Sequence, residues 1–145
     1  MEFIIRFVVR NVCWEATREN SGQHPSCHRA RGPPTTIAFS PSGKFLAMTI
    51  MDGSAFPPDS PFYHDGGRVA VHAVKGVHLS KVAEAKIGHW SQGLVWARNG
   101  KHILVENMVE KDVMVFDFDG KAVQDTGKRA ALKGGGAALR TATNP

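Results

Sequence analysis

Two stretches of the chain carry the same order of apolar and polar positions. Residues 36–48 and 94–105 each begin with an apolar run that ends in an aromatic residue, Phe39 in the first and Trp96 in the second. A polar turn closing on Gly-Lys follows, and then comes a second apolar run. Period-two alternation and short apolar runs bounded by turn residues are typical of β-strands. Each stretch therefore predicts a strand, a tight hairpin turn and a second strand.

The pattern continues beyond each hairpin. After the two apolar runs at Phe45–Ile50 and 102–105, we expect further strands at residues 68–74, 77–87, Asp112–Phe118 and 121–125, the last of them weaker. The valines at 69 and 71 match those at 113 and 115. Each copy is therefore predicted to be a four-stranded antiparallel meander.

The spacing between the copies predicts an insertion in the first one. Gly43 and Gly100, in the first turns, are 57 positions apart, whereas Gly76 and Gly120, in the second turns, are 44 apart. The difference of 13 residues falls between the second and third strands of the first copy, at residues 51–67, a stretch rich in Pro, Asp, Ser and Gly. We expect this insert to be mostly irregular.

Repeated four-stranded units of about 40–55 residues are typical of β-propeller blades. The fold class predicted here is therefore all-β, with two blades of antiparallel four-stranded meanders at residues 35–87 and 93–127. Two hairpins of a sandwich or barrel are the alternative. Phe39 and Trp96, at matching places in the two copies, are both expected to be buried.

Residues 1–34 do not share the pattern. The short apolar run at residues 3–9 predicts one strand, since it is too short for a membrane span and lacks the features of a signal peptide. The rest of this arm reads as a loop, so the sequence leaves the compartment open. Cys13 and Cys27 lie here without a close Cys pair, which favours two ordinary thiols over a zinc site or a disulfide.

Residues 128–145 form a glycine-rich tail. The run Gly134-Gly135-Gly136 lacks the Gly-Lys-Ser/Thr ending of a phosphate-binding loop. We interpret the tail as a connector leading toward the first strand of a further blade. The net charge of +5 is spread along the chain, +2 in residues 1–34 and +3 in the rest, which argues against nucleic acid as a partner.

A resemblance to a known family supports the repeat. The run Phe39-Ser40-Pro41-Ser42-Gly43-Lys44-Phe45-Leu46-Ala47, and the run 100–105 followed by 113–117, resemble lactonase-type (YVTN-repeat) β-propellers over about residues 35–140. The resemblance implies seven blades in the complete fold, of which this chain would supply a two-blade, C-terminal fragment. The same hairpin recurs in WD40-like and TolB-like propellers. The family includes sugar-lactone hydrolases, but no catalytic motif carries over to residues of this chain.

Meander geometry gathers three connections at one end of the blades: residues 51–67, 88–93 and 107–111. We call this the loop end, and the end with the tight turns the hairpin end. Loops on a rigid scaffold are where binding residues concentrate. Among the polar and aromatic residues of these connections, the candidate ligand-binding residues are His64, Asp65, His89, Trp90, Gln92, Asn107 and Glu110. The alternative is that each is an ordinary solvated loop residue.

Three functions remain open from the sequence. The chain is expected to act as a binding or scaffold module without catalysis. The alternatives are a hydrolase of a sugar lactone, which would use His64, Asp65 and His89 and be active only with the missing blades, and a module that supplies blades to a partner chain. No cofactor, resident metal or membrane is predicted. Because two blades leave apolar sheet faces uncovered, we expect self-association or pairing with missing blades.

Overall fold

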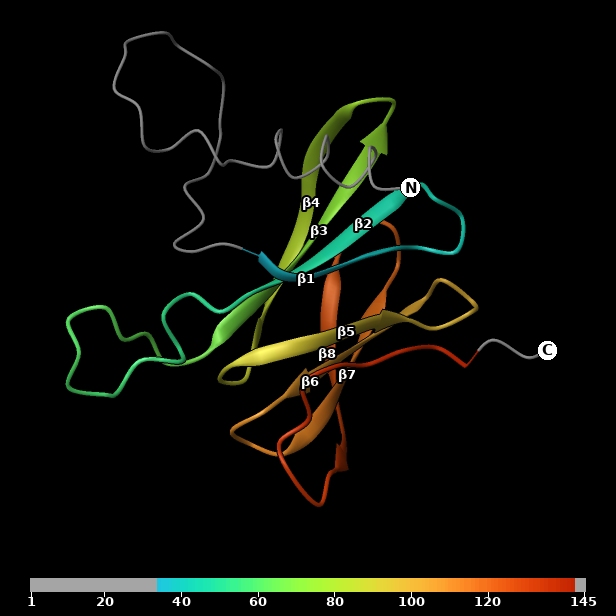
Figure 1. Ribbon diagram of the computed structural model, residues 1–145. Coiled ribbons are helices and arrows are strands. Elements are labelled where there is room, and N and C mark those ends of the chain that lie inside the picture. The colour runs from blue at the N-terminus through green and yellow to red at the C-terminus, as the bar shows by residue number, and fades with distance from the viewer. Residues whose placement is uncertain (1–33, 143–145) are drawn as a thin grey trace, which may run out of the picture.

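The computed structural model describes residues 34–142 (Figure 1). The strand expected at residues 3–9 and the two cysteines lie outside the described residues. Within residues 34–142 every regular element is a strand, and no helix there is long and apolar enough to cross a membrane. The all-β prediction is therefore confirmed for the part of the chain that the structure describes.

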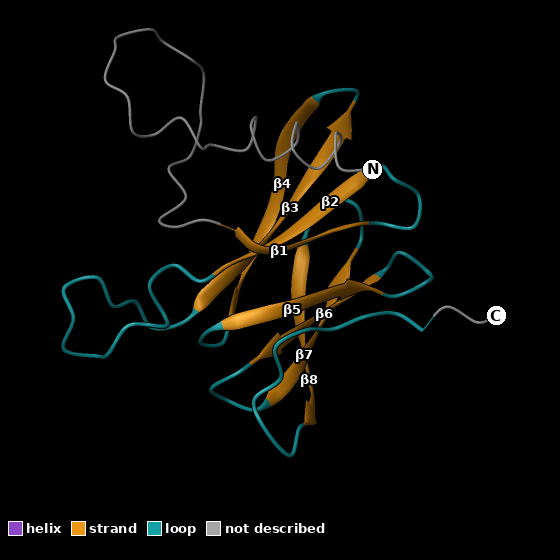
Figure 2. Ribbon diagram, in the orientation of Figure 1, coloured by secondary structure: helices purple, strands orange, loops and turns teal. Residues whose placement is uncertain are grey.

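Two four-stranded antiparallel sheets make up this part of the chain (Figure 2). The first blade contains β1 (Pro34–Phe39), β2 (Phe45–Ile50), β3 (Gly67–Lys75) and β4 (His78–Ile87), and the second contains β5 (Ser91–Trp96), β6 (His102–Asn107), β7 (Asp112–Phe118) and β8 (Val123–Ala131). The strand order in each sheet is the order of the sequence. Each sheet is therefore a meander, and the prediction of two propeller blades is confirmed.

The strand register reproduces the two spacings of the sequence repeat. Phe39 pairs with Leu46 as Trp96 pairs with Ile103, so the first two strands of the blades correspond at a spacing of 57. In the same way, the pairing of Thr49 with Val69 corresponds to that of Glu106 with Val113. Residues at these spacings therefore occupy equivalent places in the two sheets.

The last strand differs from the prediction. It was expected at residues 121–125, but β8 begins at Val123 and continues to Ala131. The Asp119 carboxylate accepts hydrogen bonds from the backbone N–H groups of Lys121 and Ala122, at 2.8 and 2.7 Å, which holds both residues in the turn. Beyond the turn, β8 is largely exposed and polar and is held by its pairing with β7. The sequence of this segment therefore lacks the apolar alternation from which a strand is predicted.

The main core lies between the two sheets. Buried side chains from β2, β3 and the end of β4 pack against those of β5, β6 and β7, and the cluster includes Val69, Val71, Ile87, Trp96, Ile103 and Phe116. The Trp96 indole N–H donates a hydrogen bond to the backbone carbonyl of Ala38, at 3.0 Å. Its ring also meets Phe118 edge to face at 5.4 Å. Phe118 belongs to the same blade as Trp96, so Trp96 is joined to the first blade by the hydrogen bond to Ala38 and by their shared core cluster.

Phe39 is not buried, contrary to the prediction. It occupies the place equivalent to Trp96, yet it is 40% exposed whereas Trp96 is 4% exposed. Paired residues share one face of a sheet, so Trp96 and Ile103 face the first blade. The equivalent face of the first blade points away from the second blade, which leaves Phe39 at its margin.

The outward face of the first blade does not expose its central residues. Leu46, Met48, Ile50 and Ala70 form a second buried cluster, with other apolar side chains of the same sheet packed around them. The expectation of self-association or of pairing with missing blades stays a prediction.

The contrast between the equivalent aromatic residues gives a stability prediction. Trp96→Ala should lower the free energy of unfolding by about 3–5 kcal/mol, because it removes a buried ring at the blade interface. The matched change Phe39→Ala should cost less than about 1 kcal/mol, since the ring is partly exposed. Urea unfolding of both variants measures the difference, and equal losses would contradict the assigned register.

Candidate functional site

The insert meets the other connections at the loop end. Tyr63 Oη lies 3.1 Å from His89 Nε2, and the backbone N–H of Trp90 donates to Ser54 Oγ at 3.1 Å. Residues 51–66 contain turns and bends but no strand, and in Figure 1 they form the long loop that projects beyond β3. The prediction that the insert is irregular and lies beside His89 and Trp90 is confirmed.

His89 is the centre of a polar cluster drawn from both blades. Its Nδ1 lies 2.6 Å from Glu110 Oε1, and its backbone N–H donates to the same carboxylate at 3.0 Å. Its Nε2 lies 3.2 Å from Asp65 Oδ1, close to the Tyr63 hydroxyl, and Lys86 Nζ lies 2.7 Å from Asp65 Oδ2. The imidazole is therefore held between two carboxylates.

The contacts of His89 depend on its protonation. A carboxylate accepts hydrogen bonds, so Glu110 fixes the proton on Nδ1. In the neutral ring, Nε2 then accepts from the Tyr63 hydroxyl, and in the charged ring it donates to Asp65. The stacking of the Tyr63 and His89 rings, 6.1 Å apart and 12° from parallel, keeps both partners in reach.

Lys86 sets the electrostatics of the exposed carboxylate in this cluster. Its hydrogen bond and positive charge, helped by His89, hold the pKa of Asp65 below its ordinary value. Asp65 therefore stays ionised and offers an accepting oxygen rather than a proton. Asp65 is therefore suited to binding a hydrogen-bond donor.

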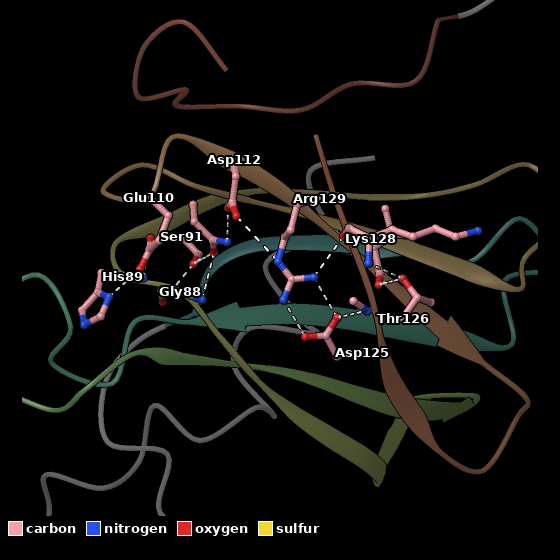
Figure 3. A network of polar contacts seen from close by, with 12 residues as sticks. Gly88, His89, Ser91, Glu110, Asp112, Asp125, Thr126, Lys128 and Arg129 are labelled. Carbon is pink, nitrogen blue, oxygen red and sulfur yellow. Dashed lines mark hydrogen bonds and ion pairs between the residues drawn. The ribbon is translucent and has the colours of Figure 1, made fainter. Parts of the chain in front are cut away.

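Asn107 acts as a buried support beneath the cluster. Its Oδ1 accepts hydrogen bonds from the backbone N–H of Gly88, at 3.0 Å, and from Ser91 Oγ, at 2.6 Å. Its Nδ2 donates to Asp112, at 2.7 Å. Figure 3 shows the network continuing from Asp112 to Arg129 on β8. Asn107 therefore positions the connection that carries His89.

The remaining candidates lie outside the cluster. Trp90 is exposed with a positive φ of 50°, and Gln92 lies within β5, where its backbone carbonyl accepts a hydrogen bond from the Thr36 hydroxyl. His64 lies beside Gly53 in the insert. The structure thus brings together His89, Asp65 and Glu110 of the predicted set.

Sequence reasoning missed Lys86 as a member of the cluster. It is the second-last residue of β4, and the pattern of that strand gave no reason to separate it from the other exposed lysines. In residues 34–142, no three His, Cys, Asp or Glu side chains are arranged to hold a metal ion. A groove of about 600 Å³ opens at the hairpin end, walled by Phe45, Phe118 and the turns near them, and none of the loop-end residues lines it.

Glu106 is a second residue that sequence reasoning missed. It is 1% exposed, and neither carboxylate oxygen has a well-formed hydrogen bond among the described residues. A Cβ atom added to Gly93 or Gly136 would lie 2.9 or 2.7 Å from these oxygens, so the carboxyl is enclosed by backbone on both sides. Burial raises its pKa, and the backbone N–H of Gly136 partly offsets the rise. Glu106 lies 57 residues after Thr49, so the sequence repeat identifies the two positions as equivalent. Only the fold shows that the carboxyl of Glu106 is enclosed.

Comparison with known proteins places the fold. No family model matches the chain, and no curated protein matches it. The structure of a candidate 6-phosphogluconolactonase from Bacteroides fragilis NCTC 9343 is similar, with a TM-score of 0.60 and 20% sequence identity. The similar region covers 74% of this chain and 28% of the lactonase chain. A second candidate 6-phosphogluconolactonase, from Bacteroides uniformis ATCC 8492, is similar over 69% of this chain and 27% of its own length, with a TM-score of 0.56 and 19% identity. Hydrazine synthase from Kuenenia stuttgartiensis is similar over 81% of this chain and 29% of its own length, with a TM-score of 0.55 and 17% identity.

These likenesses show a shared fold. The chain spans between 27% and 29% of the length of the three proteins. Their activities belong to proteins of greater length, so the local geometry carries any functional argument for this chain.

The enclosed carboxyl of Glu106 gives a pH prediction. Its folded pKa is raised, so the neutral form stabilises the fold below the unfolded pKa of about 4.3, and that contribution is lost as the pH rises through the folded pKa. Glu106→Gln keeps the neutral form at every pH. The unfolding free energy of the variant should exceed that of the wild type increasingly above about pH 4, by about 1.4 kcal/mol per unit of pKa difference.

Urea unfolding between pH 4 and 8 measures this difference. Asp59→Asn, which changes an exposed carboxyl of the insert, serves as the control and should follow the wild-type curve. Parallel curves for the wild type and Glu106→Gln would show that the carboxyl is not enclosed in solution.

Proposed function

We propose that the chain is a binding module that presents a polar ligand site at the loop end of two propeller blades. The observation that carries the proposal is the placement of His89 between Glu110, at 2.6 Å, and Asp65, at 3.2 Å. The residues come from three separate connections, which only the folded blades bring together. The ligand class that fits two carboxylates and a tyrosine hydroxyl is a small molecule with several hydroxyl or amine groups.

The contacts within the cluster favour binding over catalysis. Both ring nitrogens of His89 already have partners, and Asp65 is paired with Lys86. A general base must lie within hydrogen-bond reach of the proton that it takes from a substrate, and the Tyr63 hydroxyl occupies that place at Nε2 of His89. Here a ligand would instead exchange its own hydrogen bonds for those of the side chains, as at a recognition surface.

Chemical-shift mapping of the labelled full chain tests the site. A panel of sugars, sugar acids, gluconolactone and polyamines serves as the probe. We expect shifts at Tyr63, Asp65, His89 and Glu110 with at least one compound. His89→Ala should weaken its Kd about 10- to 100-fold, because it removes hydrogen bonds to charged groups.

Two further variants control this experiment. Tyr63→Phe keeps the ring and removes only the hydroxyl that contacts His89, so it should weaken binding. His102 makes a similar contact with Asp117, 2.7 Å, at the hairpin end, and His102→Ala should leave the Kd unchanged. Shifts confined to the hairpin end, or equal losses in both histidine variants, would contradict the proposed site.

Lactone hydrolysis is the second candidate function. It is supported by the fold shared with two proteins described as candidate 6-phosphogluconolactonases, and by a histidine flanked by carboxylates. The gluconolactone samples of the same panel report it directly, since conversion to the acid changes the ligand spectrum. A rate above spontaneous hydrolysis that His89→Ala abolishes, with or without added divalent metal, would replace the binding proposal by the hydrolase.

We also propose that further blades pack beside the second one. Thr49 of the first blade lies beneath the start of β5, because the Thr35 hydroxyl contacts both Thr49 Oγ1 and the carbonyl of Ser91, at 2.9 Å each. Glu106 is the equivalent of Thr49, and Gly136 packs against it. This contact of the tail supports the proposal that the first strand of a third blade begins there.

A mass measurement tests this packing proposal. Static light scattering of the full chain at micromolar concentration should give an average mass above the 15.8 kDa of one chain, as copies or other blades cover the open side. A uniform population of single chains across the concentration range would count against it.

A further inference from the structure

The insert between β2 and β3 carries two exposed aromatic side chains. Phe56 is 51% exposed and Phe62 is 68% exposed, and their ring centroids lie 6.0 Å apart. Trp90 and Val109, which are also exposed, belong to the neighbouring connections of the loop end. Of the six exposed large apolar residues in residues 34–142, four therefore gather at one end of the blades.

The insert is an ordered loop fixed at its base. Asp52 pairs with Arg68 of β3 at 3.1 Å, and the Trp90 backbone N–H donates to Ser54. On the returning limb, Tyr63 contacts His89 at 3.1 Å. These three contacts hold both limbs of the loop against the blades.

The tip of the loop is also held internally. Backbone hydrogen bonds of 2.8–3.0 Å close four successive turns between Met51 and Tyr63. The two limbs touch at Gly53, where an added Cβ would lie 2.1 Å from the Phe62 carbonyl oxygen. Three prolines at 57, 58 and 61 restrict the backbone further. The loop therefore loses little conformational entropy on binding, which is the main cost of recognition by a loop.

The charge of the insert indicates the chemistry of its partner. Residues 51–66 contain three aspartates and no lysine or arginine. Asp52 and Asp65 are paired with Arg68 and Lys86, whereas Asp59 is exposed between the two phenylalanines. Because Arg68 and Lys86 neutralise the other two aspartates, Asp59 is the negative charge that the loop presents, and it favours a basic protein surface over an anionic lipid surface.

We infer that the insert is a protein-docking element in which Phe56 and Phe62 enter an apolar pocket rimmed by lysine or arginine on a partner protein. Buried aromatic anchors surrounded by polar contacts carry most of the affinity at such interfaces. Asp59 meets the basic rim, and the fixed base of the loop presents both rings in the conformation that binds. This role is separate from the polar cluster at His89 and does not require a ligand there.

Selection of a random peptide library displayed on phage against the immobilised full chain tests the inference. Enriched peptides should combine an apolar centre with lysine or arginine on its flanks. The double variant Phe56→Ser/Phe62→Ser should weaken their Kd about 10- to 100-fold. Asp59→Asn should produce a smaller loss that disappears at high salt.

The control variant is Val77→Ser, which removes an apolar side chain of similar exposure, 54%, in the β3–β4 turn at the hairpin end. It should leave the Kd unchanged, and circular dichroism should show the same fold for all variants because every changed residue is exposed. Glu110→Gln alters the polar cluster through its contacts with His89, which lie outside the insert, so it should also leave peptide binding intact and separates this inference from the ligand site.

Three results would overturn the inference. The first is that enriched peptides are acidic or bind the double variant as tightly as the wild type. The second is that the full chain sediments with vesicles of neutral or anionic phospholipid in a manner that depends on the two phenylalanines, which would assign the loop to a lipid surface. The third is self-association that the double variant abolishes, which would assign it to a second copy of the chain.

Discussion

The packing of the two sheets around Trp96 is the interaction on which the loop end depends. Trp96 closes β5 and joins the first blade through Ala38, while Ser91 begins β5 just after His89. A strand of six residues spans about 20 Å, so the hairpin-end contact fixes the direction in which the strand leaves the cluster. His89 can meet Tyr63 and Asp65 of one blade and Glu110 of the other only while the sheets keep this arrangement.

The repeat could be predicted from the sequence because its signals are local. Turns closing on Gly43 and Gly100, both at positive φ, separate strands whose apolar alternation is plain. The spacings of 57 and 44 then appear unchanged in the strand register. The place of the insert followed from the same spacings, since an antiparallel meander allows its second connection only one end.

Other features required the three-dimensional structure. Phe39 is exposed although it is equivalent to the buried Trp96. Burial of this residue depends on which side of the blade has a neighbouring blade, and the hydrophobic pattern does not contain that information. Glu106 reads as a charged residue at the end of a strand, and its enclosure comes from Gly93 and Gly136, which are distant in sequence. Lys86 joined the cluster for the same reason, through a contact with Asp65 across 21 positions.

Hydrogen exchange at the tryptophan indoles tests the central claim most directly. The account predicts that the Trp96 indole N–H, buried and bonded to Ala38, exchanges orders of magnitude more slowly than that of the exposed Trp90. Two-dimensional NMR of the labelled full chain resolves these signals, and Trp90→Phe and Trp96→Phe assign them. Exchange of the Trp96 indole as fast as that of Trp90 would show that the blades do not pack in this way, and the site at His89 would lose its structural basis.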